Sequence, residues 1–283
     1  MNVLNHQIEK IKRNRVTFLL IVLTAIGTLI VGYLADRLFK SIALLTAMWL
    51  CSIVIDMYAA RKPANFEITV RRPGLETIFI ILFALCMLVY LSFQFMGLLK
   101  WENFGNFGRI AKLLTCLLFL FPVALAITMF ILRYRFKELG FRFNGLLLAI
   151  PVIMITAIAG LIFFPKNFNI LTFYKEIGGV KAWILELFIG AALAEEFWRY
   201  IAQTRFGALL KNNGLGWFLA SALWALMHVP VLCSQGLSVG IALLSALHII
   251  PIGLMWGYLT YRTKSILPSI LAHGMNIWGL QNF

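Results

Sequence analysis

The chain has 283 residues, of which 61% are apolar and 13% are charged, and its formal net charge is +14. Soluble domains contain about 25% charged residues, so this composition excludes an ordinary soluble domain and favours a chain embedded in a lipid bilayer. The basic surplus does not indicate nucleic-acid binding, because Lys and Arg lie mainly in the short connections between apolar stretches, where they orient a membrane protein.

Long apolar stretches recur along the whole chain. A helix needs about 20 such residues to cross a bilayer. We therefore predict an all-α polytopic membrane protein with eight or nine transmembrane helices, the last being short and starting near Pro268. The predicted helices cover residues 16–35, 42–60, 77–98, 113–132, 146–164, 182–201, 215–233, 239–258 and 266–281.

The basic residues are unevenly divided between the two ends of these helices. About twice as many lie on the side of the N-terminus as on the other side, and the connections of the N-terminal side include Arg15, Lys62, Arg205, Lys211 and Lys264. Basic connections tend to stay in the cytoplasm. We therefore predict a cytoplasmic N-terminus and an integral multi-pass protein of the cell membrane.

Ionisable residues divide the predicted helices into two groups. Up to about residue 169 the helices contain almost none. The later helices contain Glu186, Glu195, Glu196, Arg199, His228, His248 and His273. A charge at bilayer depth costs roughly 2.5–3.5 kcal/mol, so such residues usually face a polar cavity and mark function. We predict that residues 1–175 shield the site and that residues 176–283 form a four-helix unit with a catalytic cavity.

The strongest candidate motif is the sequence E-E-x-x-R at residues 195–199. On a helix Arg199 follows Glu195 by four residues and Glu196 by three, so it can contact either carboxylate. One carboxylate can then stay ionised as a base while Arg199 holds the other. The alternative is a structural ion pair at the end of a transmembrane helix, which needs only one Glu.

His228 and His273 are candidates for the same site. His228 and Glu195 both lie about 20 Å from the predicted cytoplasmic ends of their helices, so we expect them to meet. His273 and Asn276 are three residues apart, would share a helix face, and can stabilise an oxyanion. The alternatives are a packing histidine at residue 228 and simple helix-to-helix hydrogen bonds at residues 273 and 276.

Three other ionisable residues are weaker candidates. Glu186 lies about half a turn around the helix from Glu195 and is expected to face another surface. His248 is expected to bond a carbonyl exposed by Pro251, and Asp56 is expected to be solvated near a helix end. We predict no role in the site for these three.

These motifs, in order, resemble those of the CPBP intramembrane proteases, also called the Abi or CAAX-processing family, which includes the type II CAAX prenyl endopeptidases. The resemblance rests on Glu195-Glu196-x-x-Arg199, on Trp224 four residues before His228, and on His273, and it covers roughly residues 182–283. It implies a glutamate-dependent peptide hydrolase in a membrane-enclosed cavity.

The resemblance also implies a role for each matching residue. Glu195 would be the general base for the attacking water, with His228 assisting it. Glu196 and Arg199 would organise the site, and His273 with an Asn would form the oxyanion hole.

Two positions depart from the family pattern. Trp224 replaces the more usual Phe. The polar residue that often follows the last His by four is here Ile277, and the amide is one residue earlier, at Asn276. One residue corresponds to about 100° of rotation on a helix.

The predicted function is hydrolysis of a peptide bond by water that Glu195 and His228 activate. The predicted partners are the lipid bilayer and a peptide or prenylated-protein substrate, in CAAX-type C-terminal processing or related peptide maturation. Two alternatives remain. One is a non-catalytic scaffold or immunity protein of the same fold, which Ile277 favours. The other is a proton-coupled transporter, because intramembrane Glu, Arg and His also form ion pathways.

No cofactor is predicted, because the chain has no H-E-x-x-H zinc signature. The alternative is a zinc site formed by Glu195, His228 and His273, a ligand set of two His and one carboxylate. In that case only Glu196 would remain as the base.

Overall fold

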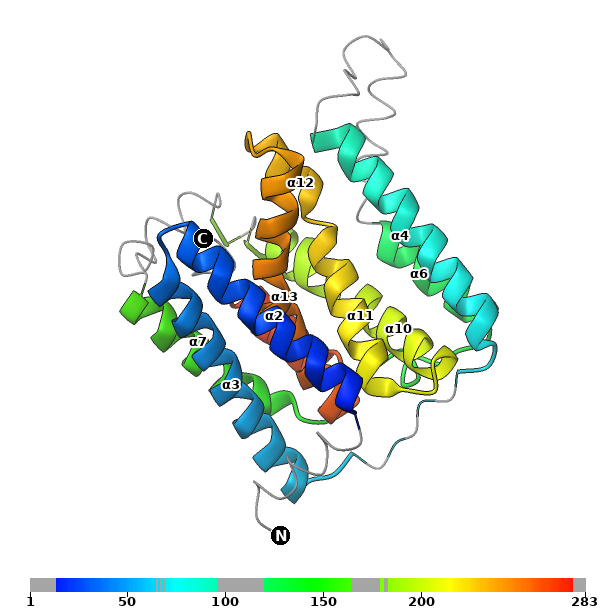
Figure 1. The fold of residues 1–283 in the computed structure, drawn as a ribbon. Coiled ribbons are helices and arrows are strands. Elements are labelled where there is room, and N and C mark those ends of the chain that lie inside the picture. The colour runs from blue at the N-terminus through cyan, green and yellow to red at the C-terminus, as the bar shows by residue number, and fades with distance from the viewer. Residues whose placement is uncertain are drawn as a thin grey trace.

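The computed structural model describes residues 14–64, 66, 68, 70–95, 120–163, 179–180 and 183–276 (Figure 1). Its elements are helices joined by turns and short connections. In chain order they are α2 (Arg15–Leu34), α3 (Leu38–Arg61), α4 (Pro73–Phe95), α6 (Leu120–Ile131), η3 (Leu146–Leu148), α7 (Ala149–Phe163), η4 (Trp183–Leu193), α10 (Ala194–Leu209), α11 (Asn213–Leu226), α12 (Val229–Ser234), α13 (Val239–Thr263) and α14 (Leu267–Gly274).

Within the described ranges, six helical stretches are long and apolar enough to cross a membrane. They are α2, α3, α4, η3 with α7, α11 with α12, and α13. The chain is therefore a multi-pass membrane protein. The predicted count of eight or nine transmembrane helices stays a prediction, because parts of the predicted helices 113–132 and 266–281 lie outside the described residues.

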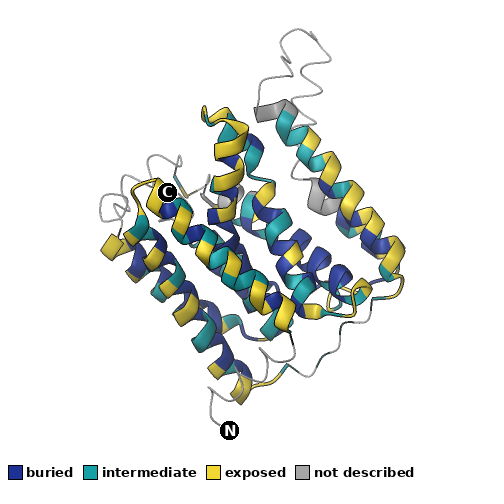
Figure 2. Cartoon of the chain, in the orientation of Figure 1, coloured by how far each residue is buried: buried dark blue, intermediate teal, exposed yellow. Residues whose placement is uncertain are grey.

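The N-terminal helices present apolar side chains outward, as helices in contact with lipid do. Leu19, Leu23, Ile26 and Ile30 of α2 are all exposed, and the outer faces of α2 and α4 are largely exposed in Figure 2. Figure 1 places α2, α3 and α7 on one side of the molecule and α4 with α6 on the other. The C-terminal helices lie between these two groups.

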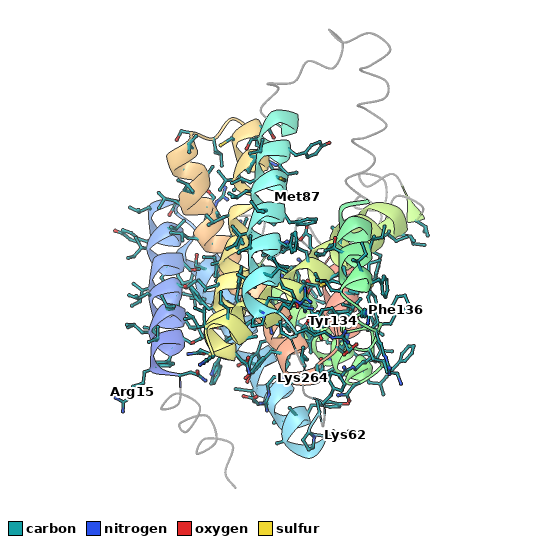
Figure 3. The ribbon with its side chains drawn as sticks, turned by 90° about the vertical axis from the view of Figure 1, so that its right-hand side faces the viewer. Arg15, Lys62, Met87, Tyr134, Phe136 and Lys264 are labelled. Atoms are coloured by element: carbon teal, nitrogen blue, oxygen red, sulfur yellow. The ribbon has the colours of Figure 1, made fainter. Side chains whose placement is uncertain are left out.

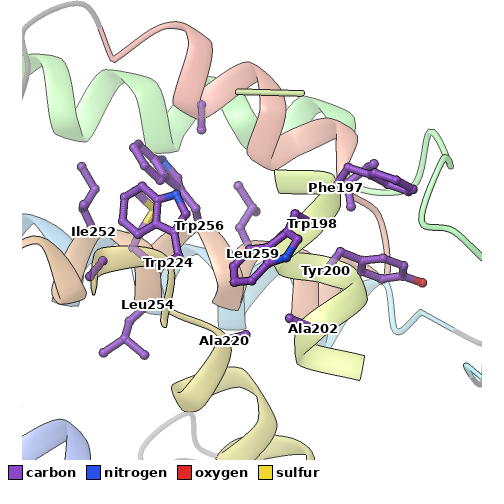
Figure 4. Packing of buried hydrophobic residues seen from close by; sticks show 14 of the residues in the cluster. Phe197, Trp198, Tyr200, Ala202, Ala220, Trp224, Ile252, Leu254, Trp256 and Leu259 are labelled. Atoms are coloured by element: carbon purple, nitrogen blue, oxygen red, sulfur yellow. The ribbon is translucent and has the colours of Figure 1, made fainter. Parts of the chain in front are cut away.

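Helix α13 is central among the described helices and contacts α2, α3, α10, α11, α12 and α14. Helices α10 and α11 cross very closely, because a Cβ atom at Gly216 would lie 2.3 Å from the backbone nitrogen of Gly207. Small residues allow such close approach of membrane helices. Ala202 and Ala220 continue this contact, beside the buried rings of Trp198 and Trp224 (Figure 4).

A buried ion pair joins the N-terminal helices to α10. Arg205 Nε lies 2.9 Å from Glu76 Oε2, and both side chains have an exposed fraction of 0%. The Tyr134 hydroxyl donates to Glu76 Oε1 at 2.7 Å, and the backbone N–H of Arg72 donates to the same oxygen at 2.9 Å. Burial raises the pKa of Tyr134, which keeps this donor protonated. The expected place of Arg205 in a connection is therefore wrong, because it lies inside the protein.

One end of the molecule gathers basic residues. Figure 3 shows Arg15, Lys62 and Lys264 toward the same end, whereas Met87 of α4 lies toward the other. This is the end where α2 begins and where α3, α10 and α13 finish. Its assignment to the cytoplasm stays a prediction from the distribution of charge.

Candidate active site

Glu195 and Glu196 lie in the first turn of α10, directly after the π-helix η4. π-Helical segments are rare and frequently accompany functional sites. Consecutive residues of an α-helix point about 100° apart, so neighbouring side chains meet different surroundings. The two carboxylates are in fact held in different ways.

Glu196 is buried and fully engaged. Its residue is 1% exposed, it forms an ion pair with Arg199, and its Oε1 lies 2.9 Å from Nδ1 of His273. Arg199 is equally buried, and its guanidinium lies 5.0 Å from the ring centroid of Trp224 and 5.6 Å from that of Trp256. Cation–π contacts of this kind stabilise a desolvated cation. Arg199 therefore forms its ion pair with Glu196, three residues earlier, and not with Glu195.

Glu195 is the more open of the two carboxylates. Its side chain is 33% exposed, and its Oε2 accepts a hydrogen bond from Nε1 of Trp224 at 2.5 Å. Nε2 of His273 lies 3.8 Å from the same oxygen. Glu195 therefore has a fixed orientation and retains accessible surface, which is what a carboxylate needs to act on a water molecule.

His273, on α14, lies between the two carboxylates. Nδ1 faces Glu196 and Nε2 faces Glu195. The ring stacks on Trp256 with centroids 3.8 Å apart and an interplanar angle of 15°. Because an ionised carboxylate only accepts hydrogen bonds, Nδ1 carries a proton toward Glu196. His273 thus joins α14 to the first turn of α10.

His228 occupies the junction between α11 and α12. Its Nδ1 lies 3.1 Å from the carbonyl oxygen of Trp224, so Nδ1 is the donor and Nε2 is left to accept or exchange a proton. The imidazole is edge-on to the indole of Trp224, with centroids 4.7 Å apart. Trp224 therefore contacts both Glu195 and His228, and the described residues show no direct hydrogen bond between those two side chains.

Asn276 has a different position from the predicted one. Helix α14 ends at Gly274, so Asn276 does not share a helix face with His273. Its backbone N–H donates to the carbonyl of His273 at 2.9 Å, and the residue is 9% exposed. The argument from helical spacing is therefore wrong for this pair, because the chain turns after Gly274. Ile277 lies outside the described residues, and the catalytic role of Asn276 stays a prediction.

Trp256 is a site residue that sequence analysis missed. It is 1% exposed and contacts both Arg199 and His273. An aromatic residue in an apolar helix gives no signal by itself, since it resembles any other packing residue. Trp256 also lies 5.7 Å from Trp224 between ring centroids, and Figure 4 shows the two indoles side by side.

The weaker candidates lie away from this cluster in so far as they are described. His248 is buried, and its Nε2 lies 3.4 Å from Oγ of Ser41 on α3. Asp56 is 5% exposed, accepts a hydrogen bond from Tyr258 at 2.6 Å and pairs with Arg262 at 3.0 Å. The expectation that Asp56 is solvated is therefore wrong. The side chain of Glu186 lies outside the described part of the structure.

The described residues contain no group of three or more His, Cys, Asp or Glu side chains arranged to hold a metal ion. The alternative zinc set of Glu195, His228 and His273 is therefore not gathered into such a site. Arg199 supplies a positive charge beside Glu196. The absence of a cofactor stays a prediction.

Comparison with known families gives a match over this part of the chain. Residues 177–278 match the family model described as type II CAAX prenyl endopeptidase Rce1-like. The matched region contains the whole cluster and Asn276. Comparisons with the curated proteins and with the solved structures gave no match. The resemblance to the CAAX protease family is thereby confirmed for this region.

Proposed function

We propose that this chain, whose residues 177–278 form a type II CAAX prenyl endopeptidase Rce1-like domain, is an intramembrane endopeptidase that activates water with Glu195. One observation supports the choice of Glu195 above all. Of two consecutive carboxylates, Glu196 is buried and forms an ion pair with Arg199, whereas Glu195 is 33% exposed. Within the described residues, the one group that can form an ion pair with Glu195 is the imidazole of His273, when it is protonated.

The proposed reaction begins with a water hydrogen-bonded to Glu195. Glu195 removes a proton from the water while the oxygen forms a bond to the carbonyl carbon of the peptide. The carbonyl π electrons move onto oxygen, and His273 presents an Nε2–H to this oxyanion. When the C–N bond breaks, the proton held by Glu195 passes to the leaving amine, with His228 Nε2 as a relay.

The surrounding residues support this chemistry by holding charge in place. The Trp224 N–H fixes one oxygen of Glu195, and Arg199 compensates Glu196. Indole rings from α11 and α13 surround the cluster, so the electrostatic interactions act in a medium of low dielectric constant, where they are stronger than in water. In this proposal Glu196, Arg199 and Trp224 are positioning residues.

The proposed substrate is a prenylated C-terminal tail of the C-a-a-X type, and an unlipidated peptide is the alternative within the same reaction class. The family match supports a peptide or prenylated-protein substrate. Such tails are attached to the cytoplasmic face of membranes. The end of the molecule that carries Arg15, Lys62 and Lys264 would accordingly face the cytoplasm (Figure 3).

The test is cleavage of a quenched fluorescent peptide by detergent-purified protein, with and without a farnesyl group on its cysteine. We expect Glu195→Gln to lower kcat by roughly 10²–10⁴-fold, the usual contribution of a general base, with no change in thermal stability. Asp56→Asn is the matched control, since Asp56 is also a carboxylate near a cation but lies outside the cluster.

Three outcomes separate the possibilities. Loss in Glu195→Gln together with dependence on the lipid supports a CAAX-type endopeptidase. Loss without lipid dependence retains the protease and discards the prenylated substrate. Normal turnover by Glu195→Gln overturns the proposed mechanism.

A further inference from the structure

A second polar site lies nearer the basic end of the molecule. A partly open cavity of about 690 Å³ is lined by the later part of α10, the start of α11 and the end of α13, together with Ala64, Phe66 and Ile68 between α3 and α4. Its volume is within the range of about 300–1,000 Å³ that small ligands occupy. The polar side chains that line it are Tyr200, Gln203, Thr204, Asn213, Thr260, Tyr261 and Lys264.

Lys264 is the one charged side chain among the described residues that line this cavity. Its Nζ lies over the ring of Tyr261, 4.4 Å from the centroid, and no carboxylate in the described part of the chain pairs with it. Burial lowers the pKa of Lys264, and the nearby cations Arg262 and Arg142 lower it further. A half-buried cation next to other cations is stabilised by a bound anion.

Gln203 adds a second polar group to the wall. It is 4% exposed, and its amide oxygen accepts no hydrogen bond from the described residues. A buried polar atom without a partner costs about 1–3 kcal/mol. This oxygen is shielded from the cavity, so Gln203 is a polar part of the wall, and Lys264 is the group that offers a cation to an anionic ligand.

The cavity lies at a defined distance from the charged cluster. Gln203 follows Glu195 by eight residues on α10, and Lys264 follows Trp256 by eight residues at the end of α13. Eight residues of α-helix correspond to about 12 Å. An extended peptide covers about 3.3–3.6 Å per residue, so three to four residues bridge this distance.

We propose that this cavity binds the C-terminal carboxylate of the peptide substrate, with Lys264 as the residue that recognises it. A C-a-a-X tail has three residues after its cysteine and ends in a carboxylate, which matches both the distance and the charge. The inference rests on the proposed function, because it puts the scissile bond beside Glu195. It makes Lys264 a residue that determines specificity for the free end of a chain.

The experiment measures binding rather than cleavage. Two fluorescent farnesylated C-a-a-X peptides, identical except for a C-terminal carboxylate or amide, are titrated into the Glu195→Gln variant in a neutral detergent. We expect the carboxylate peptide to bind about tenfold more tightly, the usual gain from a hydrogen bond to a charged group. Adding Lys264→Met should abolish that preference, and Lys264→Arg should keep most of it.

Lys211→Met is the matched control. Lys211 also follows the end of a helix in the left-handed conformation, with φ of 51° against 55° for Lys264. It is exposed and does not line the cavity. Its replacement removes one positive charge from the same end of the molecule, so it should leave the preference for the carboxylate intact.

Equal affinity for the two peptides, or a preference that survives Lys264→Met, overturns the inference. Displacement of the carboxylate peptide by phosphatidylglycerol at low mole fraction, together with Lys264-dependent binding of that lipid alone, would assign the cavity to a lipid headgroup instead. The two proposals fail separately. If the wild type cleaves the peptide but shows no Lys264-dependent preference for the carboxylate, the proposed protease stands and the binding site is refuted. If the preference depends on Lys264 but the wild type does not cleave, the binding site stands and the proposed protease is refuted.

Discussion

The two ends of helix α10 bury charge in different ways. Near its end, Arg205 and Glu76 form a pair with exposed fractions of 0%, and Tyr134 completes the hydrogen bonding of the carboxylate. In its first turn, Glu196 and Arg199 are equally buried, but Glu195 next to them is 33% exposed. Burial alone therefore does not identify a reactive site. A buried pair beside a second, accessible carboxylate is the more informative pattern.

The largest expected effect on stability is at the end of α10. Arg205→Met leaves Glu76 buried without its cation, and breaking a buried pair from one side costs about 3–5 kcal/mol. We expect a large decrease in the midpoint of thermal unfolding, followed in detergent by tryptophan fluorescence. The double variant Glu76→Leu, Arg205→Met should recover most of the loss, because an apolar pair has no charge to desolvate.

The same double variant also tests the comparison itself. If the Glu76–Arg205 pair is structural, the double variant should cleave peptide at the wild-type rate per folded molecule. A large decrease in kcat with normal stability would contradict the distinction between the two ends of α10, because it would show that the Glu76–Arg205 pair takes part in the reaction.

A smaller effect is expected from Trp224→Phe, which restores the aromatic residue more usual in the family. This change removes the N–H that donates to Glu195 and retains most of the ring. A hydrogen bond to a charged group contributes about 1.5–3 kcal/mol, so kcat should decrease by roughly ten- to a hundredfold with little change in KM.

Trp217→Phe is the control for Trp224→Phe. Trp217 lies on the same helix and donates its indole N–H to the carbonyl of Leu254 at 2.9 Å, a neutral acceptor outside the cluster. We expect this variant to keep its kcat and to lose only a little stability. Equal loss of activity in both variants would show that the indole rings act through packing and not through the hydrogen bond to Glu195.

Part of the candidate site is visible in the sequence because its residue types are unusual for their surroundings. Glu195, Glu196, Arg199 and His273 are conspicuous because they interrupt apolar helices, and the structure brings them into one cluster. Their catalytic roles stay predictions. The sequence does not decide whether Arg199 forms its ion pair with Glu196 or with Glu195, because spacings of three and four residues both place the side chains on one helix face.

Other features depend on packing between distant segments and leave no local signal. Glu76 and Arg205 are separated by 129 positions, and the contact between Asp56 and Tyr258 spans 202. The count of basic residues places Arg205 in a connection, and the position of Asp56 near a helix end indicates solvent, so both residues are misplaced. Helix α14 ends at Gly274, although the spacing of residues 271–276 predicts that the helix continues.

The smallest expected effect is that of a metal chelator. A dication at the cluster would have to approach Arg199, which already compensates Glu196, and would need donors that are now engaged in hydrogen bonds. We expect peptide cleavage to change by less than about twofold after incubation with 1,10-phenanthroline and dialysis, a much smaller change than the contribution of a general base. Loss of activity that zinc restores would contradict this, and it would move Glu195 from the role of base to that of ligand. In that case Glu196 would have to be the base. Its ion pair with Arg199 would then matter for proton transfer as well as for holding the site together.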